Sequence, residues 1–317
     1  RAAGNAQLLD RLDLVVSAGN GERDISLDGR VLEGLRTSPE PGRYLNETLA
    51  SGLRPTLYLG ELSNLLAGNI QIVHKVTGSS RTFKGEEMAG VSAIEDAWRR
   101  IGAGQSEIAL VGGAREDLLL GYELGCNLWP HPYASVWRRR AAGGGFIPGS
   151  AGAFLLVEAA DHARDRGAKP YARLTRVASD RSSRAPGAAG ATLATLIGRV
   201  TADLPEGPIG VLSGASGVEP VTSEELAVLR GLADARRPAA IRAYGSRLGH
   251  TVEAHVPLGV ALGALAASLG TFYPPFDDSE VEQPLDRAPA TVLVTSLGHW
   301  RGEGVVRLDP VVGEATR

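Results

Sequence analysis

Apolar and polar residues alternate in blocks along this chain, and the order of the blocks is repeated. In the first stretch, the apolar run 12–19 (LDLVVSAG) predicts a strand, and a long irregular region separates it from a helix expected at 87–101. A second strand is expected after that helix, at 107–114 (EIALVGGA). Continuous runs rich in Val, Ile and Leu are typical of strands that are buried on both faces.

The second part of the chain follows the same plan. A strand is predicted at 209–217 (IGVLSGASG), a small-residue helix at 253–269 and a further strand at 290–298 (ATVLVTSLG). The linking stretch 143–174 predicts a glycine-rich turn, a strand at 153–158, a polar helix and one more strand. The repeated order of strand, loop, helix and strand indicates a duplicated architecture.

Small residues dominate one of the expected helices. In 259–270 (GVALGALAASLG), glycine and alanine allow close backbone approach, so we expect this helix inside the molecule, against sheets or another helix. The longest apolar run, 256–269, is too short and too rich in glycine and alanine to span a bilayer, which also favours a buried helix. Strands that alternate with such helices predict an α/β fold built in layers.

Composition and charge narrow the classes of function. The 317 residues are 43% hydrophobic and 22% charged, which suits one large domain or two similar ones. A net charge of -3 gives no support to a nucleic-acid surface. Cys126 is the single cysteine, so an intrachain disulfide and a cysteine-based metal site are excluded. A cytoplasmic location is therefore the expectation.

Four segments carry a resemblance to a known family. They are 90–114 (GVSAIEDAWRRIGAGQSEIALVGGA), 149–174 (GSAGAFLLVEAADHARDRGAKPYARL), 246–270 (SRLGHTVEAHVPLGVALGALAASLG) and 294–304 (VTSLGHWRGEG). In this order they resemble the β-ketoacyl-acyl carrier protein synthases, the condensing enzymes of the thiolase fold. The resemblance implies a duplicated α-β-α-β-α layered fold with buried central helices.

The same resemblance divides the chain into two thiolase-like halves, residues 1–160 and 161–317. The family's usual first strand and helix would precede Arg1, so we expect the first half to be truncated at its start. More narrowly, 77–87 (TGSSRTFKGEE) and 298–304 (GHWRGEG) are similar to synthase-like proteins of α-proteobacterial very-long-chain fatty acid gene clusters. Those proteins are encoded beside a conventional synthase.

The resemblance also assigns the family's catalytic positions. In that family a cysteine at the start of the central helix attacks the acyl thioester, activated by the helix end. The matching register places Glu87 there. Of the two histidines that assist decarboxylation, the second matches His250, and Gly214 stands in place of the first. The family's lysine matches Gly245, with Arg247 as an alternative cation.

Further positions around this site are expected to bind substrate: Glu86, Lys84, Gly298, His299 and Trp300, the last three in the turn where the family carries its gating phenylalanines. We expect Lys84 to form an ion pair with the glutamate at the nucleophile position. A one-residue shift of register would exchange the roles of the two adjacent glutamates.

Plainer interpretations stay open at the same residues. A glutamate at the start of a helix also acts as a simple cap, because it accepts free amides and meets the positive end of the helix dipole. His250 in a loop before a helix is equally compatible with a structural hydrogen bond. His250 and His255 do not share a helical face, and the sequence offers no evident third ligand, so no metal site is expected. No cofactor is expected either.

Two functions remain in competition. The first is a β-ketoacyl synthase-like subunit, inactive in condensation, that pairs with an active synthase to elongate acyl chains on acyl carrier protein. Family relatives called chain-length factors also replace the cysteine and act as such partners. The second is a malonyl-carrier protein decarboxylase or atypical acyltransferase that uses His250. Conventional condensation requires a different register at Glu87. The expected partners are acyl carrier protein and an active synthase as heterodimer partner, or a second copy in a homodimer.

Overall fold

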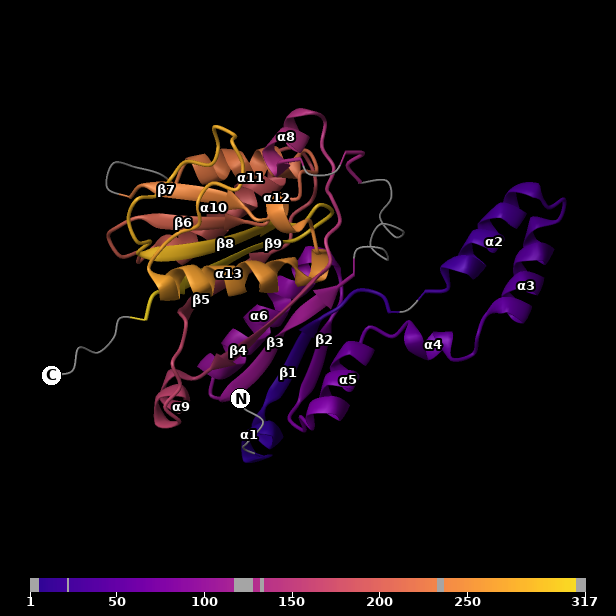
Figure 1. The fold of residues 1–317 in the computed structure, drawn as a ribbon, viewed down its shortest axis with the longest axis horizontal. Coiled ribbons are helices and arrows are strands. Elements are labelled where there is room, and N and C mark those ends of the chain that lie inside the picture. The colour runs from indigo at the N-terminus through magenta and orange to yellow at the C-terminus, as the bar shows by residue number, and fades with distance from the viewer. Residues whose placement is uncertain (1–5, 22, 117–127, 132–133, 233–236, 312–317) are drawn as a thin grey trace.

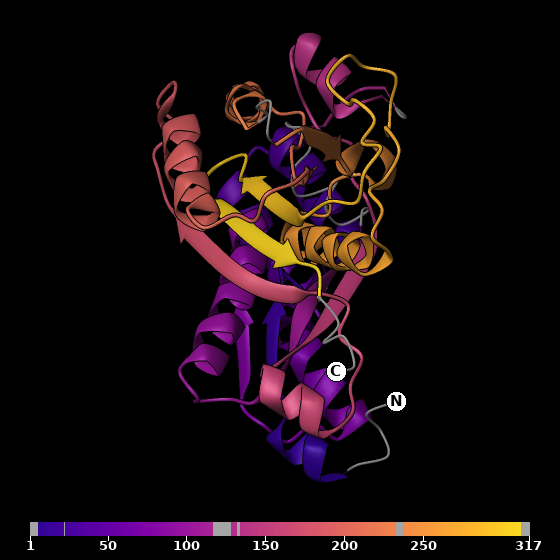
Figure 2. The ribbon, with the colours of Figure 1, turned by 90° about the vertical axis from the view of Figure 1, so that its left-hand side faces the viewer.

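The computed structural model describes residues 6–21, 23–116, 128–131, 134–232 and 237–311 (Figure 1). Two β-sheets stand one above the other, with helices between and outside them (Figures 1 and 2). Every strand of the first sheet precedes residue 159, and every strand of the second follows residue 172. The division into halves at 160 and 161 stays a prediction.

The first sheet has four strands in the order β2-β1-β3-β4. Their bounds are Asp13–Ser17 for β1, Ser80–Phe83 for β2, Ile108–Arg115 for β3 and Ala151–Glu158 for β4. Strand β1 runs parallel to both of its neighbours, and β4 is antiparallel to β3.

The second sheet has the order β5-β9-β8-β6-β7. Its strands are Arg173–Asp180 (β5), Ile209–Ser213 (β6), Ala239–Ala243 (β7), Thr291–Leu297 (β8) and Glu303–Asp309 (β9). Strand β6 is parallel to β7 and β8, while β9 is antiparallel to β8. The series β7-β6-β8-β9 therefore repeats the order and directions of β2-β1-β3-β4, and the predicted duplication is confirmed.

Two long helices, α6 (Glu86–Gly102) and α13 (His255–Leu269), fill the layer between the sheets (Figure 1). Helices α10 (Ala188–Thr201) and α11 (Val221–Arg230) cover the outer face of the second sheet, and α5 (Leu65–His74) packs on the first. The layers thus follow the predicted α-β-α-β-α order. The other helices are α1 (Ala6–Arg11), α2 (Ile25–Thr37), α3 (Pro41–Gly52), α4 (Leu57–Gly60), α8 (Val136–Ala141), α9 (Ala160–Asp165), α12 (Gly245–Leu248) and the 3-10 turn η3 (Val252–Ala254).

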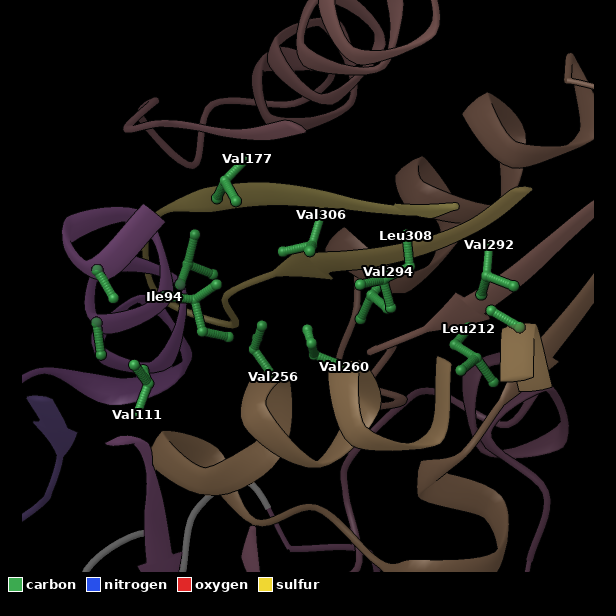
Figure 3. Packing of buried hydrophobic residues seen from close by; sticks show 14 of the residues in the cluster. Ile94, Val111, Val177, Leu212, Val256, Val260, Val292, Val294, Val306 and Leu308 are labelled. Carbon is green, nitrogen blue, oxygen red and sulfur yellow. The ribbon is translucent and has the colours of Figure 1, made fainter. Parts of the chain in front are cut away.

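The central core joins both sheets to the two middle helices. Ile94 of α6, Val260 of α13 and Val294 of β8 belong to one buried cluster (Figure 3). By length and composition, Val252–Leu269 is apolar enough to cross a membrane, but here it lies between the sheets. The prediction of a buried helix is therefore confirmed.

Small residues set the spacing of this middle layer. A Cβ atom added at Gly90 of α6 would lie 2.7 Å from Pro257 Cδ and 2.8 Å from the Glu253 carbonyl oxygen. A Cβ added at Gly263 of α13 would meet Leu308 Cδ1 at 2.7 Å. Gly90 lets α6 approach the start of α13 and brings their N-terminal ends together, while Gly263 lets α13 pack closely on β8 and β9.

Two sequence predictions are corrected by the fold. The region before α6 is not irregular, since α2 to α5 occupy most of it, with α2 and α3 packed on each other and directed away from the sheets (Figure 1). The sequence pattern also missed β2, β7 and β9. Strand β2 is a short, partly exposed edge, and β7 contains the buried Arg242, so neither shows a continuous apolar run. Cys126 lies outside the described residues.

Candidate functional site

Glu87 stands in the first turn of α6 and is fully buried. The chain enters the helix through a tight turn in which Gly85 has φ 124° and Glu86 has φ 40°, both in the left-handed half of backbone space. The free amides and the positive end of the helix dipole favour a carboxylate at this place. The turn therefore aims the Glu87 side chain at the space between the sheets.

His250 lies in the loop before α13, and its backbone is clamped by a second loop. Its amide donates to the Ile147 carbonyl at 2.7 Å, and its carbonyl accepts from the Gly149 amide at 3.1 Å. The preceding Gly249 has φ 71°. The Phe146 ring packs on the imidazole with a centroid distance of 5.0 Å. These contacts fix where the His250 ring points.

His299 lies in the turn between β8 and β9. The Gly298 amide donates to the Gly302 carbonyl at 2.9 Å and closes this turn. The Arg184 guanidinium donates to the Gly298 carbonyl from the opposite side, at 2.6 Å from Nη2. The turn is thus held by its own hydrogen bond and by Arg184, and it buries the His299 ring against Glu87.

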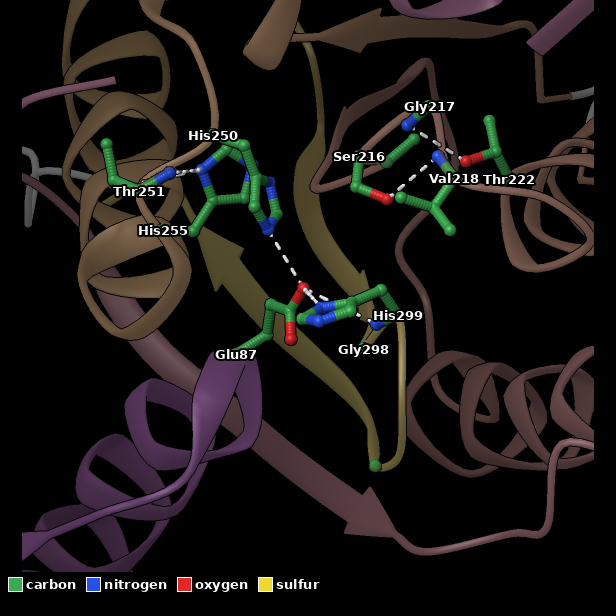
Figure 4. Close-up of polar contacts among 12 residues, drawn as sticks. Glu87, Ser216, Gly217, Val218, Thr222, His250, Thr251, His255, Gly298 and His299 are labelled. Atoms are coloured by element: carbon green, nitrogen blue, oxygen red, sulfur yellow. Dashed lines mark hydrogen bonds and ion pairs between the residues drawn. The ribbon is translucent and has the colours of Figure 1, made fainter. Parts of the chain in front are cut away.

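The three side chains meet at one oxygen atom. Glu87 Oε1 lies 2.8 Å from His250 Nε2 and 2.8 Å from His299 Nδ1 (Figure 4). The His299 amide also points at this oxygen, at 3.4 Å. Because a carboxylate only accepts hydrogen bonds, both ring nitrogens must donate. The second oxygen, Oε2, is buried and has no hydrogen-bond partner among the described residues.

The protonation of the cluster follows from burial and charge. Burial acts to raise the pKa of Glu87, but the charge of His299 and the hydrogen bonds from both histidines outweigh it and hold the pKa well below its ordinary value. Burial also acts to lower the pKa of His299, yet the Glu87 charge raises it above the ordinary value. For His250 burial prevails, and its pKa falls. These directions favour the charged forms of Glu87 and His299 and the neutral form of His250.

Two other predicted site residues lie away from the cluster. Lys84 is exposed, and the expected Lys84–Glu87 ion pair is wrong, because the two histidines partner the carboxylate instead. Arg247 is also exposed, at the surface of α12, so it does not serve as a replacement cation beside His250.

Glu86 and Glu87 have separate environments. The Glu86 carboxylate accepts from Arg301 Nε at 3.3 Å and is partly exposed. Glu87 faces the histidines, so the structure distinguishes the two glutamates that the sequence left exchangeable.

Part of this chain matches a known protein family. Residues 15–163 match the family model described as beta-ketoacyl synthase, N-terminal domain. The chain is 29% identical over 154 residues to 3-oxoacyl-[acyl-carrier-protein] synthase 2 of Rhizobium meliloti (strain 1021), an alignment that covers 46% of this chain and 37% of the relative.

A second relative belongs to a polyketide synthase. The tetracenomycin polyketide synthase ketoacyl synthase beta subunit of Streptomyces glaucescens is 34% identical over 109 residues, which cover 32% of this chain and 26% of that protein. The aligned part thus spans only about a quarter to two fifths of these curated relatives.

Solved structures show the same fold. The ishigamide ketosynthase/chain length factor superposes with a TM-score of 0.62 at 20% identity, covering 96% of this chain and 76% of that one. A ketosynthase from a type II polyketide synthase complex with its acyl-carrier protein gives a TM-score of 0.69 at 18% identity, covering 96% of this chain and 79% of that one. The predicted thiolase-like α/β fold of the β-ketoacyl synthases is confirmed.

That Gly214 stands in place of the family's first histidine stays a prediction. A Cβ atom added there would lie 2.6 Å from the Thr295 carbonyl oxygen and 3.2 Å from the Tyr244 hydroxyl. The buried His255 ring packs on Tyr244 at a centroid distance of 4.3 Å. The space beside Gly214 is therefore filled by residues of the second half, and a histidine would not fit without displacing them.

A pocket of about 500 Å³ opens next to the cluster and is lined by Arg184, His299, Trp300 and Arg301. Trp300 is largely exposed at its mouth. Both arginines of the lining are paired with carboxylates, Arg184 with Glu303 and Arg301 with Glu86. Gly298 and His299 are buried and Trp300 is exposed, and the predicted role of the three residues in substrate binding stays a prediction.

The sequence pattern missed several residues of this site. His299 was expected to bind substrate, but its pairing with Glu87, 212 positions away, was not foreseen. Phe146 and Arg184 were not singled out at all. The glycine-rich stretch around Phe146 carried a usable signal, because glycines in a loop permit the close approach to the His250 backbone.

Proposed function

We propose that this chain is a non-condensing β-ketoacyl synthase-like subunit that pairs with an active synthase in the elongation of acyl chains on acyl carrier protein. The observation that carries the proposal is the position of Glu87, whose carboxylate occupies the start of α6 and engages both histidines. Very-long-chain fatty acid synthesis is the setting that the sequence resemblance favours.

A carboxylate at this position is a poor replacement for the thiol. Attack of Glu87 on an acyl thioester would give a mixed anhydride, which is less stable than the thioester from which it forms. The ion pair with His299 further reduces the nucleophilicity of the carboxylate. We therefore infer that the chain does not form an acyl-enzyme.

Decarboxylation at His250 is less well supported. The Nε2 atom of His250 donates to Glu87, so it does not face a substrate, and the position of the first histidine is filled at Gly214. Stabilising the enolate formed from malonyl-carrier protein requires donors directed at the new oxyanion. The arrangement therefore favours a structural role over a decarboxylase or atypical acyltransferase.

The relatives support a partner. One is named as the beta subunit of a ketoacyl synthase, and one solved structure is a ketosynthase with its chain length factor. Another is a ketosynthase in complex with an acyl-carrier protein. We infer that this chain forms a heterodimer with an active synthase in the cytoplasm and contributes to the acyl pocket, with a homodimer as the alternative assembly.

Co-expression tests the proposal. The chain is produced with a cysteine-bearing β-ketoacyl synthase from the same organism, and the pair is analysed by size-exclusion chromatography with light scattering. We expect a 1:1 complex. Its condensation products should differ in chain length from those of the synthase alone. A stable homodimer that never captures the synthase would refute the pairing.

The second part of the test uses the isolated chain. Incubated with malonyl-carrier protein, it is expected to release no carbon dioxide, and incubated with acyl-carrier protein, it is expected to gain no acyl mass. Carbon dioxide release that disappears in His250→Ala would establish the decarboxylase instead.

A further inference from the structure

Glu87, His250 and His299 form a set of possible metal ligands. One ligand atom from each, a carboxylate oxygen and two imidazole nitrogens, lies within 4.8 Å of the others. The three residues come from the first turn of α6, the loop before α13 and the β8–β9 turn (Figure 4). All three are buried, and each is held by the backbone contacts described above.

Hydrogen bonding alone leaves this cluster poorly satisfied. Glu87 Oε1 faces both ring nitrogens, while Oε2 is buried without a partner among the described residues. A buried carboxylate oxygen without a partner is costly, and such atoms in a native protein call for a missing ion or water. Gly298 lies beside this oxygen, since a Cβ atom added there would be 3.3 Å from Oε2 and only 2.1 Å from the Arg301 carbonyl oxygen.

We propose that Glu87, His250 and His299 bind a divalent transition-metal ion, with zinc as the best match. Two imidazole nitrogens and one carboxylate oxygen form a common zinc set that leaves a fourth position open. The inference concerns the same site as the proposed function but does not depend on a partner or a carrier protein. In the proposed site, the Glu87 carboxylate lies between the positive end of the α6 dipole and the metal ion.

The carboxylate oxygen must move away from both ring nitrogens to admit the ion. With zinc bonds of about 2.0–2.1 Å in a tetrahedral site, ligand atoms lie about 3.3 Å apart, so Oε1 would withdraw from each nitrogen by about 0.5 Å. Each histidine must give up the proton on its coordinating nitrogen. His250 then carries its proton on Nδ1, and His299 keeps the proton on Nε2 and becomes neutral. One proton is released to solvent for each ion bound.

The protein supplies three ligands, so water is expected at the fourth coordination position. A pocket of about 500 Å³ borders His299 and is also lined by Arg184, Trp300 and Arg301. The three ligand side chains are themselves buried, so an ion reaches them only when the side chains around them move.

Metal titration of the full chain tests the inference. The protein is stripped with EDTA, exchanged into metal-free buffer and titrated with Zn²⁺ in a calorimeter and with Co²⁺ in a spectrophotometer. We expect one ion per chain and the strong visible absorption of tetrahedral Co²⁺. Substoichiometric binding, or a Co²⁺ spectrum typical of six oxygen ligands, would overturn the site.

Variants assign the ligands. Since loss of an outer contact alone weakens a metal site about 10–100-fold, His299→Ala and Glu87→Gln are each expected to weaken Zn²⁺ binding at least about 100-fold. His74→Ala removes an exposed histidine of α5 and is expected to leave binding unchanged. Circular dichroism checks whether each variant is folded. If His299→Ala does not fold, the near-isosteric Glu87→Gln alone tests whether the cluster binds Zn²⁺.

Equal Zn²⁺ affinity in wild type and folded Glu87→Gln would refute the inference, as would an equal loss in His74→Ala. The titration uses neither carrier protein nor synthase. Its failure therefore leaves the partner proposal standing, and a failure of pairing leaves the metal site standing.

Discussion

Glu87 Oε1 lies 2.8 Å from His250 Nε2, although 163 positions separate the two residues in the chain. This contact joins the first turn of α6 to the loop before α13, at the point where the two halves of the duplicated fold meet. It also directs the Nε2 atom of His250 at the Glu87 carboxylate rather than at a substrate. The predictions below test its consequences.

Removing the Glu87 carboxylate is expected to destabilise the fold. Glu87→Ala removes the acceptor of two buried imidazole donors, and leaving a buried donor unsatisfied costs about 1–3 kcal/mol. Urea unfolding in buffer containing EDTA measures the change. The matched control is Glu86→Ala, which removes a partly exposed pair with Arg301 and is expected to change stability by less than about 1 kcal/mol. Equal effects of the two substitutions would contradict the assignment of the two glutamates.

A thiol at position 87 is expected to become reactive. Glu87→Cys, made together with Cys126→Ser, places a cysteine at the start of α6 beside two histidines, which is the environment that lowers the pKa of a thiol. We expect an acyl adduct by intact-protein mass spectrometry after incubation with acyl-carrier protein, and none with Cys126→Ser alone. Condensation is not expected to follow, because Gly214 leaves no room for a histidine. Without an adduct on the folded variant, the proposed equivalence of Glu87 with the nucleophile position would fail.

The close contact of α6 with α13 depends on Gly90. Gly90→Ala brings a methyl group against Pro257 and a backbone carbonyl, and such overpacking costs about 1–3 kcal/mol. Gly102→Ala, at the other end of α6, has open space around the added methyl group and is expected to be neutral or to stabilise by up to about 1 kcal/mol. Thermal or urea unfolding compares them. If Gly90→Ala left the unfolding stability unchanged, α6 and α13 would have to lie further apart than described.

Stability is expected to fall with rising pH because of Glu225. Its carboxyl group is buried between Ser213 and Thr295, and burial raises its pKa above the ordinary value. As pH rises from the ordinary pKa to the raised one, the unfolded chain gives up this proton first, so unfolding becomes easier. Tyr244, whose pKa burial also raises, stays neutral over this range.

Glu225→Gln removes this pH dependence. At low pH the variant and the wild type should unfold at similar urea concentrations, and above the raised pKa the variant should be the more stable. Glu206→Gln, at an exposed position, serves as control. A gap between the Glu225→Gln and wild-type unfolding midpoints that stays constant from pH 4 to pH 8 would show that Glu225 does not titrate as described.

Much of the fold was predictable because it rests on continuous apolar runs. The strands β1, β3, β6 and β8 are short buried segments rich in β-branched residues and leucine, and each was expected close to where it lies. Strands without such runs were missed. Strand β2 is held by its parallel pairing with β1 at the sheet edge, and that pairing is a tertiary property with no counterpart in the local sequence.

The sequence by itself determined the duplication, the small-residue helices and, through the family resemblance, the positions of Glu87 and His250. Only the tertiary structure decided what these residues contact. Lys84 was the expected partner of Glu87 because it is near in sequence, but it is exposed, whereas His299 is brought to the carboxylate from 212 positions away. Proximity along the chain does not set the partner of a buried charge. The partner is the group that the packing of α6, α13 and the β8–β9 turn buries beside it, since an unpaired charge would be costly there.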